Sequence, residues 1–529
     1  MSVGRTLYHN CRVHEGRFSR AGRADHLRAR PDCVLVEDGV IRAVGVASEI
    51  RRSCGPHEAI DLKGMTVIPG FIDSHVHFVP TGLHAAQLDV SKCRTLDELL
   101  TSIGRAGCSG VRTQDDERPL KAYGFDETKL AEKRGPTREE LDLVCPGRPV
   151  CVSRVDGHSA NVNTAMLRMA GLEPGQEGVV LGDAGLPSGT VRGEANTRLR
   201  SFLNSLVDDE DRRAAVRLAA DAAARAGITT VCALEGGPLH NERDVYVLEE
   251  MKDDLNVNVI TFFQTTDVDL VLELGYPRIG GCITLDGSFG SRTAAVSEPY
   301  EDDPSSTGIT YFSDEELLAF VRRAHRAGLQ IAVHAIGDRA IGQMLEALAR
   351  VQQECPRQDA RHRIEHFQLA TPAQTELAVR LGVVVSGQPA FEHYWGGDSG
   401  MYRARLGLER ARRMNDFRAL LNRGVALAFG SDSPVTPMDP MLGIRTAVRP
   451  PHPHKGISIY AALDGFTIWG AWAAFEESRR GTLEPGKIAD MVALTGDPLE
   501  EGEGALEDVR VAMTVCRGRV AFVEERLFV

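Results

Sequence analysis

A helix, a glycine and a short β-branched strand follow one another repeatedly along this chain, and few folds accommodate such a repeat. Copies of this unit cover residues 212–234, 320–335, 376–388 and 417–432. In the first copy, RRAAVRLAADAAARAG is followed directly by ITTVCAL. A glycine at a helix C-terminus supplies a left-handed cap, and the apolar run after it is typical of a strand buried on both faces. The alternation therefore predicts βα units around a parallel sheet.

Eight segments have the composition of such strands, and eight parallel strands close a (β/α)8 TIM barrel. They are residues 66–72, 228–234, 256–263, 281–285, 330–334, 363–366, 383–386 and 426–430. A ninth candidate, residues 149–154, falls in the long stretch between the first two strands. We assign that stretch, about 83–211, to a large insertion after strand 1. The predicted fold class is α/β, a barrel with this insertion.

The two ends of the chain differ from its middle. Residues 31–64 and 486–526 contain short alternating strands separated by turn residues. Neither end has enough apolar surface for a core of its own, so we expect both to pair into one small composite β-sandwich. The predicted domains are therefore residues 1–64 and 481–529 for the sandwich, and residues 65–480 for the barrel with its insertion.

Composition and charge exclude several classes of protein. Hydrophobic residues make up 43% and charged residues 26%, which is typical of a globular protein and not of a disordered one. The net charge of −13 argues against a nucleic-acid binder, which would need a basic face. No apolar run reaches the roughly 18–20 residues of a membrane span. The 11 cysteines are scattered without a C-x-x-C pair, so we expect a cytoplasmic protein.

Chemistry-bearing side chains fall at the C-terminal ends of the predicted strands, where the active sites of such barrels lie. A core histidine would explain any one of these positions, but not all of them together. Histidine and carboxylate side chains converging on one rim can bind a metal ion. The residues concerned are His75 and His77 after the first strand, His334, His366 and, after the eighth strand, Asp432.

Three further segments, added to these barrel residues, make the chain similar to the amidohydrolase superfamily of metal-dependent hydrolases. They are residues 136–163, the run DGSFGSRTA at 286–294, and EPGKIADMVAL at 484–494. Within the superfamily the chain most resembles the N-substituted formamide deformylase-like branch. The resemblance implies that His75, His77, His334, His366 and Asp432 are metal ligands, and that Asp432 also moves protons.

The chain departs from the family at one position. Members with two metals commonly carry a carboxylated lysine at the end of the fourth strand, and in this branch it lies four residues before the Asp of the DGS motif. Here that position is Cys282. Cys282 is either a small buried core residue or a soft thiolate ligand for Zn²⁺ that can bridge two ions. We favour the ligand, and expect one or two Zn²⁺ ions, with another divalent transition metal as the alternative.

The ligand set predicts a hydrolase acting on a C–N bond of a linear amide, N-acyl or N-formyl compound. Zinc lowers the pKa of bound water and polarises a carbonyl, and Asp432 would shuttle the proton to the leaving amine. His158 is our candidate donor to the oxyanion, and Arg292 a weaker one. The alternatives for these two residues are a structural loop histidine and a structural ion pair.

Other positions bear on substrate and partners. Phe391, Tyr394 and Trp395 follow the seventh strand and could line an apolar substrate pocket, although they could equally be packing. His452 and His454, between prolines, are expected to be exposed loop residues. The expected partner is a small-molecule amide, without nucleic acid or membrane, and a homodimer is left open. Two alternatives to amide hydrolysis stay open: an isomerase or decarboxylase on the same metal site, and a non-catalytic scaffold.

Overall fold

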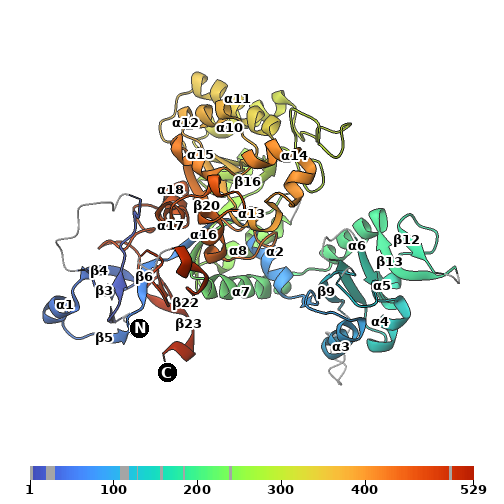
Figure 1. The fold of residues 1–529 in the computed structure, drawn as a ribbon, viewed down its shortest axis with the longest axis horizontal. Coiled ribbons are helices and arrows are strands. Elements are labelled where there is room, and N and C mark those ends of the chain that lie inside the picture. The colour runs from blue at the N-terminus through green and yellow to red at the C-terminus, as the bar shows by residue number, and fades with distance from the viewer. Residues whose placement is uncertain are drawn as a thin grey trace. The chain divides into compact units, whose positions relative to one another are not determined.

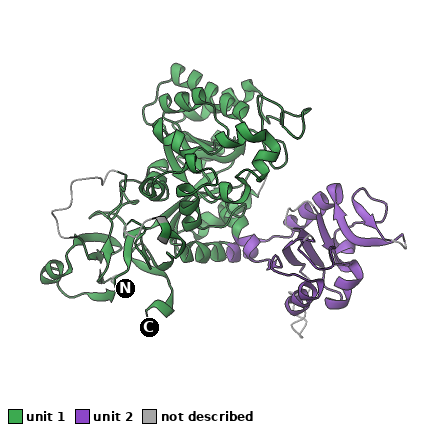
Figure 2. Cartoon of the chain, viewed as in Figure 1, with its two compact units in different colours: residues 1–81, 216–529 green, residues 82–215 purple. Residues whose placement is uncertain are grey.

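The computed structural model describes residues 4–19, 30–107, 118–127, 129–154, 159–182, 185–237, 241–499 and 503–528. The chain divides into two compact units, residues 1–81 with 216–529 and residues 82–215 (Figure 2). The divisions fall inside two helices, α2 (Phe78–Ala85) and α7 (Asp209–Arg225).

Parallel strands in chain order form the centre of the first unit (Figure 1). A three-stranded sheet has the order β15-β14-β7, and a five-stranded sheet has the order β16-β17-β18-β19-β20. β15 lies next to β16, and β20 lies next to β7. The strands are β7 (Phe71–Val76), β14 (Ile228–Glu235), β15 (Asn258–Phe263), β16 (Arg278–Thr284), β17 (Gln330–Ala335), β18 (Arg363–His366), β19 (Val384–Gly387) and β20 (Ala426–Phe429).

Helices separate these strands, as the repeat in the sequence predicts. Glycines with φ between +64° and +85° precede four of the strands, and only glycine adopts this conformation at little cost. They are Gly227, Gly328, Gly382 and Gly424. The helices are α8 (Glu242–Met251), α9 (Val268–Glu273), α10 (Asp314–Arg326), α11 (Asp338–Glu354), α12 (Pro372–Arg380), α13 (Ala390–Trp395), α14 (Met401–Arg413), α15 (Phe417–Asn422), α16 (Pro440–Val448), α17 (Ile459–Gly465) and α18 (Ile468–Ala473).

The expectation of one strand over residues 66–72 is wrong, because the segment is split at Gly70. Its first part, β6 (Thr66–Pro69), pairs antiparallel with β21 (Met491–Leu494) in a different sheet. Its second part begins β7. A Cβ at Gly70 would lie 2.3 Å from the side chain of Thr229, so glycine lets the chain pass from one sheet to the other. Both parts are apolar, and the sequence therefore reads as one run.

The fourth strand also starts earlier than expected, at Arg278 instead of Gly281. Gly280 and Gly281 have φ of +91° and +121°, and the register with β17 shifts between Gly280 and Ile283. This is a β-bulge. A pair of glycines is typical of a break in a strand, so the strand start predicted from the sequence is too late.

Strands from both ends of the chain share one sheet and an apolar core. One sheet has the order β4-β3-β1-β5, and the other the order β2-β6-β21-β22-β23. Their apolar core includes Tyr8 and Val34 from the N-terminal segment and Met513 and Val515 from the C-terminal segment. The remaining bounds are β1 (Arg5–His9), β2 (Arg12–Val13), β3 (Cys33–Glu37), β4 (Val40–Gly45), α1 (Ala47–Ser53), β5 (Glu58–Asp61), β22 (Val511–Cys516) and β23 (Arg519–Val523).

The second unit has a sheet of its own, with the order β12-β13-β11-β10-β9-β8. The strand expected at residues 149–154 is part of it. Two apolar clusters support the sheet, one including Leu99 and Val150 and the other including Met166 and Val191. The elements are β8 (Leu88–Asp89), α3 (Leu96–Gly107), β9 (Leu120–Phe125), α4 (Arg138–Val144), β10 (Val150–Arg154), β11 (Ser159–Val162), α5 (Thr164–Met169), β12 (Val179–Leu181), β13 (Pro187–Arg192) and α6 (Gly193–Ser205).

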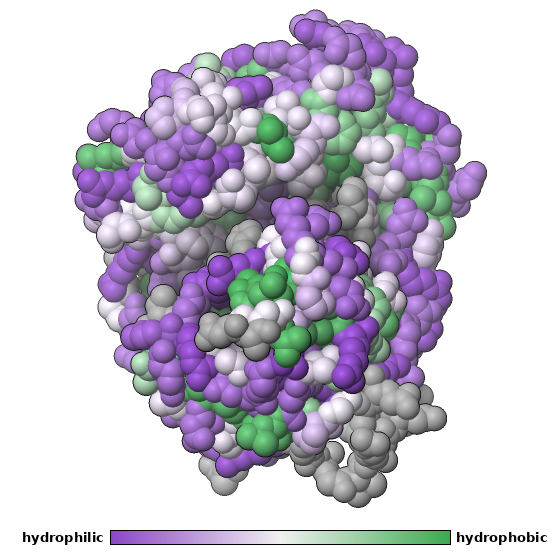
Figure 3. Space-filling model, turned by 90° about the vertical axis from the view of Figure 1, so that its right-hand side faces the viewer, coloured by the Kyte–Doolittle hydropathy of each residue, from purple (hydrophilic) through white to green (hydrophobic). Residues whose placement is uncertain are grey.

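The face drawn in Figure 3 is mainly hydrophilic, with hydrophobic residues in separate small patches. Exposed apolar side chains scattered in this way are normal on a protein surface. Within the described part of the chain, none of the helices has the length and apolar character needed to span a membrane.

Candidate metal centre

Six buried side chains that can bind a metal come together at the C-terminal ends of the parallel strands. Their ligand atoms form three overlapping groups, each with all atoms within 4.8 Å of one another. The groups are His75, His77 and Cys282; Cys282, His334 and His366; and His75, His366 and Asp432.

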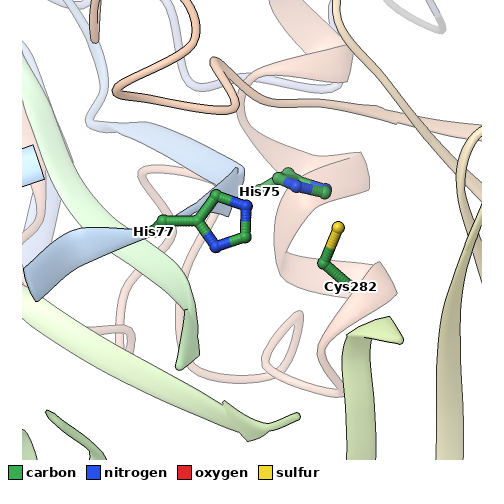
Figure 4. A group of neighbouring side chains, drawn as sticks. All are labelled: His75, His77 and Cys282. Carbon is green, nitrogen blue, oxygen red and sulfur yellow. The ribbon is translucent and has the colours of Figure 1, made fainter. Parts of the chain in front are cut away.

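Cys282 belongs to two of these groups. Its Sγ lies 3.6 Å from Nδ1 of His334, and in Figure 4 it points toward the imidazoles of His75 and His77. On the other side of the cluster, Oδ1 of Asp432 lies 3.1 Å from Nε2 of His75 and 3.2 Å from Nε2 of His77. The sulfur is thus placed between two sets of nitrogen ligands.

Local backbone distortions aim these side chains. The bulge at Gly280 and Gly281 immediately precedes Cys282, and bulges beside sites commonly redirect one side chain. A Cβ at Gly281 would lie 2.8 Å from the side chain of Leu234, so this path requires glycine. His366 and Asp432 have φ of +72° and +57°, which is a costly conformation for residues other than glycine and is concentrated at functional sites.

Each histidine is held through its second ring nitrogen. Nδ1 of His75 lies 2.7 Å from Oε2 of Glu365, and Nδ1 of His77 lies 3.0 Å from the carbonyl of Leu234. Nδ1 of His366 lies 2.7 Å from Oε1 of Gln388. Accepting groups at these positions require an N–H on Nδ1 and leave Nε2 as the ligand atom.

His334 is held in the opposite sense. Its Nε2 lies 3.1 Å from the carbonyl of Gly287, so Nδ1, next to Cys282, is its ligand atom. Oδ1 of Asp286 is also 3.4 Å from this Nε2. The Asp286 carboxylate, part of the DGS motif, accepts backbone N–H bonds from Ala295 and Gly337.

Electrostatics in the cluster favour an ionised thiol and carboxylate. Burial opposes the Cys282 thiolate, but the charge of His334 outweighs it and holds the pKa of Cys282 well below its usual range. Burial also opposes the charge on Asp432, whose pKa His75 and His77 nevertheless hold well below its usual range. Burial disfavours protonated His77, yet Asp432 and Cys282 raise its pKa to about 10. The anionic ligands thus attract positive charge into the cluster.

Two buried ligand atoms without hydrogen-bond partners indicate whether a metal ion fits the cluster. Nε2 of His75 and Oδ1 of Asp432 are buried without a hydrogen-bond partner. Because His75 gives its proton to Glu365, the two atoms face each other as lone-pair donors at 3.1 Å. A divalent cation satisfies such a pair, and imidazole, thiolate and carboxylate together suit Zn²⁺. The residues fit a metal ion.

Of the two predicted oxyanion donors, only Arg292 is among the described residues. His158 is outside the described residues. The guanidinium of Arg292 binds Asp302 at two points, with distances of 3.0 Å and 2.9 Å, and Asp302 is shared with Arg405. Arg292 thus takes part in an ion pair, as the alternative left open by its sequence context expects, and its role as an oxyanion donor stays a prediction.

The aromatic residues after the seventh strand lie beside a ligand. Phe391 is buried and stacks on His366, with ring centroids 6.0 Å apart and planes at 16°. Trp395 packs edge-on against Phe391 at 4.8 Å, and Tyr394 is largely exposed.

The expectation that His452 is exposed is wrong, whereas His454 is exposed. His452 is only 8% exposed. The loop is drawn inward because Lys455, three residues later, is buried with its Nζ 3.0 Å from Oε2 of Glu392.

Sequence reasoning missed the residues that hold the ligands, Glu365 and Gln388 among them. A signal exists in the strand RIEH. Arg363 and Glu365 alternate with the apolar Ile364, so two charged side chains share one face of a strand that is fully buried. Buried charges of this kind are almost always paired.

Comparison with known proteins identifies a family and several relatives. The family described as "Amidohydrolase family" matches residues 58–522. The chain is 30% identical over 526 residues to the putative amidohydrolase YtcJ of Bacillus subtilis (strain 168), covering 93% of this chain and 96% of that protein. It is 27% identical over 522 residues to the N-substituted formamide deformylase of Arthrobacter pascens, covering 93% and 95%.

A solved structure has a similar fold and sequence. The crystal structure of an uncharacterized metal-dependent hydrolase from Pyrococcus furiosus is 28% identical, with a TM-score of 0.77, and the match covers 94% of this chain and 100% of that one. The resemblance seen in the sequence is thus confirmed. Since the family match extends over most of its length, this chain belongs to the amidohydrolase family.

Proposed function

We propose that this protein is a metal-dependent hydrolase that cleaves a C–N bond in a linear amide, N-acyl or N-formyl compound. The observation that carries the proposal is the buried cluster of four histidines, a cysteine and an aspartate, with two ligand atoms that lack hydrogen-bond partners. The relatives support the reaction class, since one is named an amidohydrolase and another a deformylase of N-substituted formamides.

The six clustered side chains would hold one or two ions, Zn²⁺ or another divalent transition metal. With two ions, Cys282 would bridge them, because it belongs to both histidine pairs. We also propose that the eight parallel strands close into a (β/α)8 barrel, with the composite sandwich beside it. The neighbouring positions of β20 and β7 support closure, as does the backbone bond from Asp432 N to the carbonyl of His75.

A bound divalent ion supplies a water of lowered pKa and polarises the substrate carbonyl. Asp432 would take the proton of the attacking water and return it to the leaving amine. Its Oδ1 faces Nε2 of His75 and of His77, so the carboxylate lies among the ligands. We keep His158 as the proposed donor to the oxyanion. Arg292, which is paired with Asp302, stays the weaker candidate.

Phe391 and Trp395, here called the aromatic wall, support a preference for substrates with an apolar or aromatic acyl or amine group. Phe391 stacks on the ligand His366, and Trp395 packs against Phe391. A substrate group held there would exchange water for aromatic contact, which is favourable for rings and aliphatic groups. Highly charged substrates would gain nothing from this wall.

The test is a panel of N-formyl and N-acyl amines offered to zinc-replete protein, with release of free amine as the readout. We expect turnover of aromatic members, and a loss of about 10²–10⁴-fold in kcat for Asp432→Asn. Asp254→Asn removes an exposed carboxylate and serves as the matched control, with activity unchanged.

Absence of amine release from zinc-replete protein across the panel would contradict the proposal. Consumption of substrate without amine release would instead favour an isomerase or decarboxylase. A metal-replete protein inert toward all substrates would favour a non-catalytic scaffold.

A further inference from the structure

Next to the candidate metal ligands, the parallel strands enclose a charged pair in which only Glu365 has so far been given a role, that of holding His75. Arg363 and Glu365 of β18 are both fully buried. Nε of Arg363 lies 2.8 Å from Oε1 of Glu365, and Nη2 lies 2.9 Å from Oε2. The guanidinium also donates to the carbonyl of Ser74 at 2.6 Å and lies 4.5 Å from the ring centre of Phe262. The pair is rigidly held within the core.

The carboxylate of this pair continues to a metal ligand. Oε2 of Glu365 accepts a hydrogen bond from Nδ1 of His75 at 2.7 Å. The proton on Nδ1 leaves the lone pair of Nε2 directed at Asp432. A carboxylate behind a histidine fixes the ring and raises its basicity as a ligand. Arg363 keeps Glu365 anionic, because an unpaired buried carboxylate would be costly.

Within the described part of the chain, the second ring nitrogens of the other histidines lie closer to neutral acceptors than to a carboxylate. His77 and His334 are held by the carbonyls of Leu234 and Gly287, and His366 by the amide oxygen of Gln388. The carboxylate of Asp286 is 3.4 Å from His334, but its oxygens already accept three backbone N–H bonds. Of the described carboxylates behind these histidines, that of Glu365 therefore lies closest to its ring nitrogen, at 2.7 Å against 3.4 Å for Asp286.

We propose that Arg363 and Glu365 are a positioning pair that makes the two sides of the centre unequal. The side formed by His75, His77 and Asp432 binds the first ion, and the side formed by His334 and His366 binds the second more weakly. Cys282 belongs to both sides, and the ligand atom of His366 also lies within 4.8 Å of those of His75 and Asp432. The first side has an additional anionic ligand, Asp432. One of its two imidazoles, that of His75, is also made more basic by Glu365. Both differences strengthen ion binding. This inference rests on the metal centre of the proposed function.

The experiment measures Zn²⁺ affinity of the full-length protein, stripped of metal and titrated against a chromophoric chelator. The main variant is Arg363→Met/Glu365→Gln, which removes both charges together and leaves none unpaired. We expect the tighter of two affinities to fall by about 10–100-fold, with the weaker unchanged. Glu365→Gln alone is the second variant, and is used if the double variant does not fold.

The matched control is Arg480→Met/Asp490→Asn, which neutralises another buried ion pair in the same way. It should leave both affinities as in the wild type. An unchanged tighter affinity in the Arg363 and Glu365 variants, or an equal fall at both sites, would overturn the inference. Failure of the wild type to bind Zn²⁺ at all would instead overturn the proposed metal centre.

Discussion

Cys282 stands at the position where the resemblance to the family implies a lysine. Its thiol lies between two pairs of histidines, and the bulge before it turns it into the cluster. If the thiolate is a ligand or a bridge, its removal should release an ion. We expect Cys282→Ala to lose at least one metal equivalent and most activity, measured by elemental analysis of zinc-grown protein and by amine release.

Cys232→Ala is the control for this substitution. Cys232 is a cysteine of the same apolar cluster and is fully buried, but belongs to none of the ligand groups found among the described residues. It should keep its metal and lose only a modest amount of stability from the small cavity. Equal metal content in wild type and Cys282→Ala would rule out the ligand role.

At the residue scale, the clustering of the candidate ligands could be predicted but the groups that support them could not. The histidines and Asp432 each follow an apolar strand, and parallel strands bring their C-terminal ends to one edge. The partners Glu365 and Gln388 depend on side-chain contacts between different strands. Sequence spacing does not reveal such contacts, and only the unusual charge alternation of RIEH hints at them.

At the element scale, helix α13 is fastened by a buried ion pair. Lys455 and Glu392 are 1% and 2% exposed in their side chains, with Nζ 3.0 Å from Oε2. Nζ also donates to the carbonyl of Met414 at 2.7 Å. The same helix carries Phe391 beside His366. The pair therefore links the RPPHPHKG loop to the aromatic wall.

Breaking this pair from one side should destabilise the protein. Lys455→Met leaves the Glu392 carboxylate buried and uncompensated, at a cost of about 3–5 kcal/mol. We expect a lower Tm, and a higher KM for aromatic substrates because α13 loses its anchor. Thermal unfolding and steady-state kinetics at pH 7 check both. Lys455→Met/Glu392→Gln should recover part of the Tm, and a double variant no more stable than the single one would contradict this explanation.

The element boundaries show where sequence patterns stop being informative. The four capping glycines locate strand starts well, because each has a left-handed φ that favours glycine. The glycines at 70, 280 and 281 have a different role, in close backbone passage and in a bulge. Local sequence cannot distinguish a capping glycine from one needed for close packing. The difference lies in which neighbouring atoms an added Cβ would contact.

At the scale of the whole molecule, the repeated units of the first unit could be predicted because each repeats one pattern. The sheet of the second unit could not. Its strands are short and mixed in direction, with β10 parallel to β9 but antiparallel to β11. One strand of the six had a recognisable pattern. The pairing between the chain ends is clearer in sequence, because both ends show alternating strands that lack a core.

Stability of the whole molecule in acid should depend on a buried histidine pair away from the metal ligands. His362 Nδ1 accepts the backbone N–H of Ile331 at 3.0 Å, so its proton lies on Nε2 and is donated to Nδ1 of His325 at 2.8 Å. Nε2 of His325 in turn donates to the carbonyl of Cys355 at 2.8 Å. Every ring nitrogen is used with both rings neutral, and an added proton would break the chain of bonds.

Burial, with repulsion from His325 once that ring is protonated and from Arg357, lowers the pKa of His362 to about 3. Unfolded histidine titrates near 6.5, so between about pH 6.5 and 3 the unfolded chain binds the extra proton and the folded chain does not. The free energy of unfolding therefore falls as pH falls through this window, by up to about 1.4 kcal/mol per pH unit from this group. His362→Gln keeps an acceptor and a donor but cannot titrate. We expect its Tm to decline less steeply than that of the wild type between pH 6.5 and 4. An equally steep fall in Tm for the wild type and His362→Gln would show that acid destabilises the protein through groups other than His362.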